Sequence, residues 1–262
     1  MTTFLYIDYG PSPDTATELK FSLATLCQAH RDRELKVVVY TDKPEVYAAL
    51  PVRTRDLRPD FAAWSREKTY AHRVKTCVLI DALGDIDTRC VLLDSDTFVR
   101  PGFADALAAT VGGVAMDHFE RVDPYPAAAG FAAELPGLGR YAYSGAATRM
   151  YNSGLVAAEQ RHAPMLQQAL ALIDALLDKG LNQFNIEQIA VSEAFRLNGE
   201  PIAEMKPWFE HYYRRSQKLF MRPRIARLFA KLGGWRPLFS RLEPSKFNVR
   251  AAHIFARLRR GA

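Results

Sequence analysis

Short apolar segments rich in β-branched and aromatic residues alternate with helical patterns along the chain, and this alternation limits the possible folds more than any other feature. The predicted strands cover residues 3–8, 35–42, 90–94, 112–117 and 155–159. The predicted helices cover residues 18–30, 44–50, 65–83, 103–110, 162–180 and 186–197. Strands and helices that alternate in this way form a mostly parallel sheet with helices on its faces. The sequence therefore predicts an α/β fold with a central, mostly parallel mixed sheet.

The composition indicates a reduced, globular protein. The chain has 262 residues, of which 48% are hydrophobic and 24% charged, which suits one sizeable domain. Cys27, Cys77 and Cys90 lie in apolar stretches, and their spacing fits neither a zinc site nor a disulfide framework. The first residues lack the pattern of a signal peptide, and no segment approaches ~18 continuous apolar residues. We therefore expect a cytoplasmic protein with free thiols.

Two carboxylates follow the strand at 90–94, separated by Ser95. Asp94 and Asp96 would repel each other unless solvent screens them or a cation lies between them. Paired carboxylates suit Mg²⁺ or Mn²⁺, which also accept phosphate oxygens as ligands. A solvated strand-to-turn junction would show the same pattern. A phosphatase of the haloacid dehalogenase type is disfavoured, because that family has Thr where this chain has Phe98, and has the motif near its first strand.

Other polar groups surround this pattern in the sequence. Arg73 and Lys75 lie together on a predicted helix and offer a cation pair for a diphosphate. The segment at 151–155 precedes a strand, and Glu187 and Gln188 lie early in a helix from which side chains could enter a cleft. Each feature also has a structural explanation, as a surface cation, a turn or a polar helix face.

Six segments in this order resemble the nucleotide-sugar glycosyltransferases of the GT-A fold, of the family 8 type. They read TFLYIDYG, VVVYTDKPE, HRVKTCVLIDAL, VLLDSDTFVRP, YNSGLVAAE and NIEQIAVSEAF. The resemblance implies one Rossmann-like GT-A domain at residues 1–213, with a basic helical extension at 214–262. It also implies a metal-dependent transfer of a sugar from a nucleotide-sugar, such as a UDP- or GDP-sugar, to a glycan or lipid-linked acceptor.

The resemblance also implies roles for individual residues. Asp94 and Asp96 would hold Mn²⁺ or Mg²⁺ on the donor diphosphate, with His211 as third ligand and His253 as the alternative. The expected donor-binding residues, which include the cation pair, are Asp8, Tyr9, Asp42, Arg73, Lys75, Asp94, Ser95, Asn152 and Gly154. Glu187 and Gln188 would lie beside the anomeric carbon. The family has Asp-Gln at these two positions and a glycine after its late His, which this chain lacks.

The resemblance favours a retaining mechanism, in which the diphosphate oxygens can take the acceptor proton. An inverting enzyme would need a carboxylate base, for which Asp117 or Glu187 could serve. Residues 120–150, rich in proline and glycine, are expected to form a long loop that faces the acceptor.

Two other functions stay open from the sequence. A nucleotidyltransferase can share a similar sheet, but its usual glycine-rich basic loop after the first strand is missing. A non-catalytic protein that binds sugar-nucleotides or polyanions is the other alternative, and its activity would survive the substitution Asp94→Asn.

Positive charge is concentrated at the C-terminal end. Of the 35 lysine and arginine residues 14 follow Tyr213, with only one of the 29 acidic residues, so residues 214–262 carry +13 and the preceding residues −7. Ile225, Leu228 and Phe229 lie at helical spacing among these basic residues. Such a helix suits an anionic membrane surface, although a helix that closes the domain would show the same pattern. No nucleic-acid-binding module is recognisable.

A membrane surface would fit a lipid-linked acceptor, as in the assembly of bacterial envelope polysaccharide or lipopolysaccharide. We therefore expect a peripheral protein on the inner face of the cytoplasmic membrane, with no nucleic acid partner.

Overall fold

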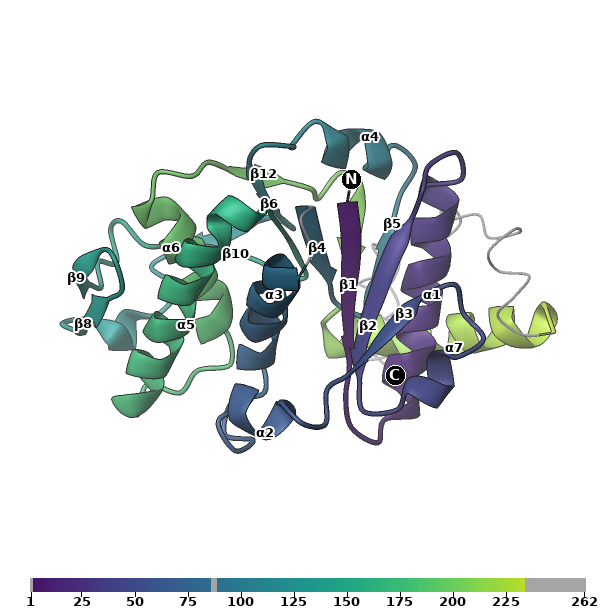
Figure 1. Ribbon diagram of the computed structural model, residues 1–262, viewed down its shortest axis with the longest axis horizontal. Coiled ribbons are helices and arrows are strands. Elements are labelled where there is room, and N and C mark those ends of the chain that lie inside the picture. The colour runs from purple at the N-terminus through teal and green to yellow at the C-terminus, as the bar shows by residue number, and fades with distance from the viewer. Residues whose placement is uncertain (1, 86–88, 234–262) are drawn as a thin grey trace, which may run out of the picture.

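The computed structural model describes residues 2–85 and 89–233, and a seven-stranded sheet forms the centre of this part (Figure 1). The strand order is β12-β6-β11-β4-β1-β2-β3. These strands are β1 (Thr2–Asp8), β2 (Lys36–Thr41), β3 (Arg53–Asp56), β4 (Arg89–Leu93), β6 (Val114–Met116), β11 (Leu155–Ala158) and β12 (Ile202–Glu204). Only β11 runs antiparallel to its neighbours, β4 and β6. The predicted mostly parallel mixed sheet is therefore confirmed.

The central strands are buried on both faces, because each contributes alternate side chains to two apolar cores. In β4, Val91 and Leu93 belong to one core, while Cys90 and Leu92 belong to the other. These four side chains are almost fully buried. This explains why the strand reads as a continuous apolar run in the sequence.

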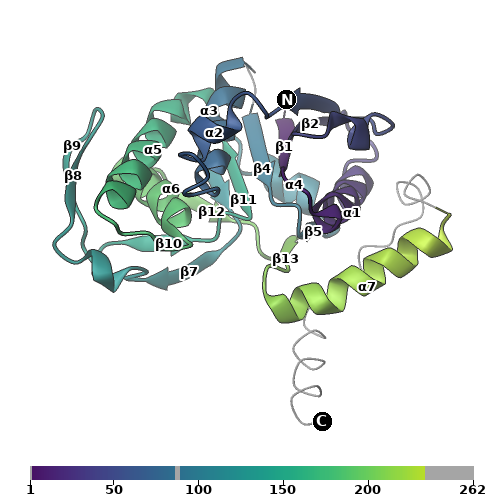
Figure 2. The same ribbon diagram turned by 90° about the horizontal axis from the view of Figure 1, so that it is seen from below.

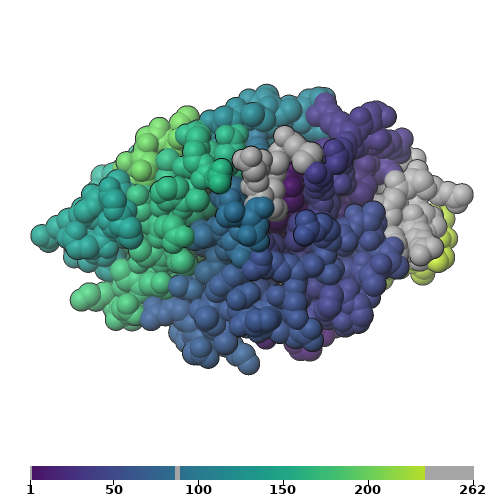
Figure 3. Space-filling model, viewed as in Figure 1, coloured from purple at the N-terminus to yellow at the C-terminus, as the bar shows by residue number. Residues whose placement is uncertain are grey.

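Helices cover both faces of the sheet. One core contains α1 (Pro13–Ala29) and α4 (Phe103–Ala108), and the other contains α3 (Arg73–Asp85), α5 (Ala163–Asp178) and α6 (Ile186–Leu197). The α2–α3 and α5 segments lie against each other on the face seen in Figure 3. Two ion pairs join them, Arg66 with Asp178 and Arg73 with Asp174. Within the described residues, no helix has both the length and the apolar composition required to cross a bilayer.

The predicted helix at 65–83 begins later than expected. A short helix, α2 (Phe61–Trp64), ends before Ser65, and α3 begins only at Arg73. Arg66, Glu67 and Lys68 between them have left-handed φ angles of 50°, 54° and 66°. Three consecutive residues in this region cannot continue a right-handed helix. Short 3₁₀ helices elsewhere are η1 (Pro44–Tyr47), η2 (Pro126–Ala128) and η3 (Gln160–His162).

The segment expected as a long loop contains regular structure. It forms β7 (Phe119–Val122), the hairpin β8 (Ala132–Leu135) and β9 (Gly139–Ala142), and β10 (Arg149–Tyr151), which pairs with β7. The turn of the hairpin places Gly137 and Gly139 at φ angles of 73°, where other residues are disfavoured. Figure 2 shows the hairpin projecting at the side of α5.

The chain then forms β13 (Phe209–His211), which pairs antiparallel with β5 (Thr97–Val99) in a separate two-stranded sheet, before α7 (Arg215–Lys231). The helix α7 packs along the edge of the domain (Figure 2). Its buried residues Phe220, Met221 and Ile225 contact Phe21 and Phe98 of the domain. Arg222 pairs with Asp14 and Glu18 of α1. The apolar stripe predicted for this segment therefore packs on the domain: Ile225 is buried, and Leu228 and Phe229 pack partly buried against the same cluster.

Substituting Ile225 with alanine should destabilise the whole domain, because Ile225 is fully buried. Truncation of a buried isoleucine costs about 2–5 kcal/mol of unfolding free energy. Leu219 on the same helix is 52% exposed, and Leu219→Ala should cost less than about 0.5 kcal/mol. Urea unfolding of the two variants makes the comparison. Equal losses in both would show that α7 does not pack as described.

Candidate functional site

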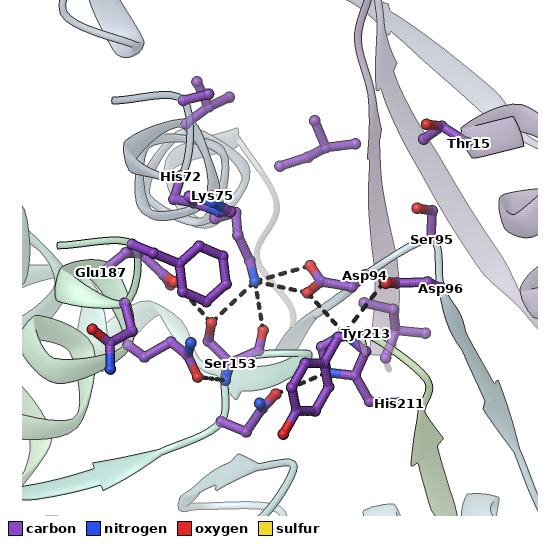
Figure 4. Close-up of a pocket in the computed structure, with 18 of the residues that line it drawn as sticks. Thr15, His72, Lys75, Asp94, Ser95, Asp96, Ser153, Glu187, His211 and Tyr213 are labelled. Atoms are coloured by element: carbon purple, nitrogen blue, oxygen red, sulfur yellow. Dashed lines mark hydrogen bonds and ion pairs between the residues drawn. The ribbon is translucent and has the colours of Figure 1, made fainter. Parts of the chain in front are cut away.

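A cleft of about 610 Å³ opens at the carboxyl ends of β1 and β4. Ile7 and Tyr9 line it from β1, and Asp94, Ser95 and Asp96 line it from the turn after β4. In open α/β sheets, this edge is where ligands usually bind. The start of α6 and the segment before α3 form further parts of the wall, so most of the predicted motifs meet in one place (Figure 4).

Asp94, Asp96 and His211 converge on one point of the cleft. Their nearest ligand atoms lie within 4.8 Å of one another. The Nε2 atom of His211 lies 3.3 Å from a carboxylate oxygen of Asp96 and 3.6 Å from one of Asp94. The ladder between β13 and β5 causes this meeting, since His211 is opposite Thr97 and the Tyr212 amide donates to the Asp96 carbonyl at 3.0 Å. Two carboxylates and one imidazole are a suitable ligand set for Mn²⁺.

Gly154 gives the His211 ring its space. A Cβ atom at this position would overlap the imidazole. The resemblance placed Gly154 among the donor-binding residues, whereas in the structure its lack of a side chain makes room for the predicted metal ligand. Any larger residue here would displace His211 from the two carboxylates.

Two ammonium groups hold the carboxylates. The Nζ atom of Lys75 lies 2.9 Å from Asp94 and donates to the carbonyl and the hydroxyl of Ser153 at 2.8 and 3.0 Å. The Nζ atom of Lys218, which comes from α7, lies 2.8 Å from Asp96. Figure 4 shows Lys75 between Asp94 and Ser153. The predicted donor-binding lysine is therefore part of the site, and Lys218 adds a cation that the sequence analysis did not select.

The charges shift the pKa values of these groups strongly. Burial alone would lower the pKa of His211, but Asp96, Asp117 and Asp94 outweigh it and raise the pKa to about 10. Burial alone would raise the pKa of Asp96, but His211 and Lys218 hold it well below its usual range. Likewise, Asp94 and Glu187 overcome the burial of Lys75 and leave its pKa raised. His211 is thus a cation while no metal is bound.

The start of α6 forms the floor beside this cluster. Glu187 is 2% exposed, accepts a hydrogen bond from the Ser153 hydroxyl at 2.8 Å, and has a pKa raised by burial. Gln188 accepts from the Ser153 amide at 3.3 Å. The hydroxyl of Tyr70 bridges this turn, since it donates to the Phe184 carbonyl and accepts from the Glu187 amide. Glu187 and Gln188 line the cleft as predicted.

Two expected site residues are turned away from the cleft, and these expectations are corrected. Arg73 does not form a cation pair with Lys75 in the cleft, because its guanidinium pairs with Asp174 of α5 at 2.8 Å and donates to backbone carbonyls of α2. Asp117 is 2% exposed and lies behind His211, 3.0 Å from the His118 ring. Asp117 does not line the cleft, so it is not placed to take a proton from an acceptor hydroxyl there.

Asp8 and Asp42 also lie outside the lining of the cleft. Asp8 is fully buried, pairs with Lys43 at 3.1 Å and accepts a hydrogen bond from the Tyr47 hydroxyl. Asp42 accepts from the Gly10 amide at 3.2 Å. The two acids therefore support the loop after β1, whereas Tyr9 of the same loop faces the cleft. His253 lies outside the described residues.

Other lining residues were missed by the sequence analysis. The ring of Phe61 stacks on Tyr9 with 3.4 Å between centroids, and Phe184 lies 66% exposed at the wall of the cleft. Lys218 could not be distinguished among the 14 basic residues near the C-terminal end. Lys218 can be identified as a residue of the cleft only when the packing of α7 is known.

The sequence matches no protein-family model and no curated protein. Solved structures do match. The galactosyltransferase LgtC, in complex with donor and acceptor sugar analogs, aligns with 77% of this chain and 72% of its own at 17% identity, with a TM-score of 0.51. Mouse xyloside xylosyltransferase 1, in its apo form, aligns with 78% of this chain and 85% of its own at 11% identity, with a TM-score of 0.50. The chain therefore has the GT-A glycosyltransferase fold that its sequence motifs predicted.

Proposed function

We propose that this chain is a metal-dependent glycosyltransferase that moves a sugar from a nucleotide-sugar donor to a glycan or lipid-linked acceptor. The observation that carries the proposal is the convergence of Asp94, Asp96 and His211 at the strand-end cleft of a GT-A fold. The two neighbouring ammonium groups give the same place the charges that a diphosphate requires. A UDP- or GDP-sugar fits this description of the donor.

The three converging side chains suit Mn²⁺ or Mg²⁺. Carboxylate oxygens are preferred by both ions, and an imidazole nitrogen favours the softer Mn²⁺. Bound there, the ion would act as a Lewis acid for the negative charge on the departing diphosphate. Lys75 and Lys218 compete for the same carboxylates while no ion is bound, so ion binding would free both ammonium groups to donate to diphosphate oxygens.

The remaining wall suits the other parts of the donor. Tyr9, stacked on Phe61, presents an aromatic surface at the end of β1 for the nucleobase. Ser95 lines the cleft beside Asp94 and Asp96, where the diphosphate would bind (Figure 4). Glu187 and Gln188 lie beside Ser153, where they can contact sugar hydroxyls and the anomeric carbon. Of the two carboxylates considered as an inverting base, Asp117 is buried behind His211 and only Glu187 lines the cleft. We keep the retaining mechanism, in which the diphosphate oxygens take the acceptor proton, as the proposal.

We also propose that α7 attaches the protein to an anionic membrane surface on the cytoplasmic side. Arg215, Arg227 and Lys231 are exposed, and Leu219 lies exposed between them on the same helix. Each basic residue near such a surface contributes about 1 kcal/mol. This placement would suit a lipid-linked acceptor, including one used in the assembly of envelope polysaccharide or lipopolysaccharide.

Replacing Asp96 with asparagine should abolish metal-dependent donor binding while the fold is kept. The variant loses a ligand, and since removal of groups that merely orient ligands costs 10–100-fold, Mn²⁺ affinity should fall by more than about 100-fold. The measurement is a thermal-shift panel of UDP- and GDP-sugars with and without Mn²⁺. Asp178→Asn, at an exposed position of α5, is the control. Stabilisation by a nucleotide-sugar without metal, or unchanged in Asp96→Asn, would contradict the proposal.

Metal binding should release a proton near neutral pH. The raised pKa of His211, about 10, means that the imidazole is protonated below that value and must lose its proton to bind an ion. The apparent Mn²⁺ affinity should therefore rise about tenfold per pH unit between pH 6.5 and 8.5. Calorimetry in two buffers of different ionisation enthalpy counts the released protons. A pH-independent affinity without proton release would exclude His211 as a ligand.

Neutralising the exposed basic residues of α7 should weaken membrane binding. The triple variant Arg215→Gln, Arg227→Gln, Lys231→Gln removes three charges, so partition into phosphatidylglycerol vesicles should fall roughly 100-fold. The control replaces three exposed arginines elsewhere, Arg31, Arg53 and Arg140, with glutamine. Vesicle sedimentation compares the two, with phosphatidylcholine vesicles as the neutral surface. Equal losses in both variants would point to net charge rather than to α7.

A further inference from the structure

The side-chain amide of Asn152 is fixed by two independent partners. The backbone amide of Gly154 donates to its Oδ1 atom at 2.8 Å, and its Nδ2 group donates to a carboxylate oxygen of Glu120 at 2.7 Å. A backbone N–H can only donate, and an ionised carboxylate can only accept. Both partners therefore require the same orientation of the amide, with oxygen toward Gly154 and nitrogen toward Glu120.

This orientation determines the proton position on His211. Its Nδ1 atom lies 2.9 Å from the same Oδ1 atom of Asn152, which is an acceptor only. Nδ1 must therefore carry a hydrogen. With the hydrogen on Nδ1, Nε2 is the nitrogen that can offer its lone pair to an ion, and it faces Asp94 and Asp96. Histidine ligands commonly have their second nitrogen held in this way by another group.

We propose that Glu120 and Asn152 are positioning residues that fix the Nδ1–H tautomer of His211 and thereby set the affinity of the metal site. The inference rests on the proposed function, because it needs His211 to be a ligand. Glu120 lies on β7, at the start of the segment between β6 and β11, and is not one of the residues that the sequence analysis selected. Glu120 also lines the cleft, and it acts on His211 through its hydrogen bond with Asn152.

Asp117 is a second acidic or polar side chain near Nδ1 of His211, besides Asn152. One of its oxygens lies 3.7 Å from Nδ1, which is beyond hydrogen-bond distance, and its other oxygen lies 3.0 Å from the His118 ring. Asp117 thus supplies negative charge near His211, whereas Asn152 supplies the hydrogen-bond acceptor. Both residues are buried and face the same ring nitrogen, so the test must separate charge from hydrogen bonding.

Two Glu120 variants separate the effect of charge from that of hydrogen bonding. Glu120→Gln removes the charge but keeps an oxygen that can accept from Asn152, whereas Glu120→Ala removes both. Mn²⁺ affinity, measured by calorimetry without nucleotide, should fall about tenfold or more in Glu120→Ala and stay within about threefold of wild type in Glu120→Gln. Glu134→Ala, at an exposed glutamate of β8, is the matched control and should change nothing.

The tautomer itself is observable. Two-bond ¹H–¹⁵N spectra of the Mg²⁺-loaded wild type should show His211 with hydrogen on Nδ1 only, and Glu120→Ala should show loss of that single form. Equal losses of affinity in Glu120→Gln and Glu120→Ala would reduce the effect to charge and overturn the inference. So would a larger loss in Asp117→Asn together with an unaffected Glu120→Ala. A wild type that binds no Mn²⁺ would overturn the proposed function instead.

Discussion

The mutual repulsion of Asp94 and Asp96 is the constraint on which the rest of the site depends. Both carboxylates lie in a partly closed cleft, where like charges interact more strongly than in water. Three cations from distant segments offset this repulsion: Lys75 of α3, His211 of β13 and Lys218 of α7. The positive groups are held in place by the sheet and its helices, so the fold as a whole keeps two acids together that would otherwise separate.

The same arrangement explains how a hard dication could replace these cations. Ammonium groups on long side chains can move away without disturbing the backbone, whereas the His211 ring is enclosed by Asn152 and by the close approach of Gly154. His211 would stay as a ligand of the ion, and Lys75 and Lys218 would turn to the diphosphate of the donor. This division of roles follows from side-chain flexibility and packing alone.

Much of the fold could be predicted from the sequence because local patterns encode it. The apolar runs at 90–94 and 155–159 and the amphipathic pattern at 162–180 became β4, β11 and α5. The left-handed turn at Arg66–Lys68 was not predictable, because none of its residues is a glycine, the residue that usually indicates positive φ angles. The strands β5 and β13 are three residues each, too short for a periodic signal.

The placement of residues at the cleft was predictable where they flank predicted strands, with Asp94 and Asp96 after one strand and Asn152 before another. It was not predictable where tertiary packing decides the direction of a side chain. Asp8 looked available at a strand end but is enclosed by Lys43 and Tyr47. Arg73 and Lys75 are a different case, because residues two apart on a helix lie about 200° apart around its axis. Helical spacing alone could have excluded their pairing in the cleft, and the structure has them on different sides, toward α5 and toward the cleft.

The packing of α7 has a mechanical consequence. Lys218 and Ile225 are seven residues apart on α7, or about 10 Å along its axis, and Pro223 lies between them. The buried residues Phe220, Met221 and Ile225 link the exposed basic end of α7 to Lys218, so a displacement of that end passes through this packed stretch to the ammonium group beside Asp96. A surface that pulls on the basic end of α7 would thus alter the electrostatic balance of the cleft, without any atom of that surface entering it.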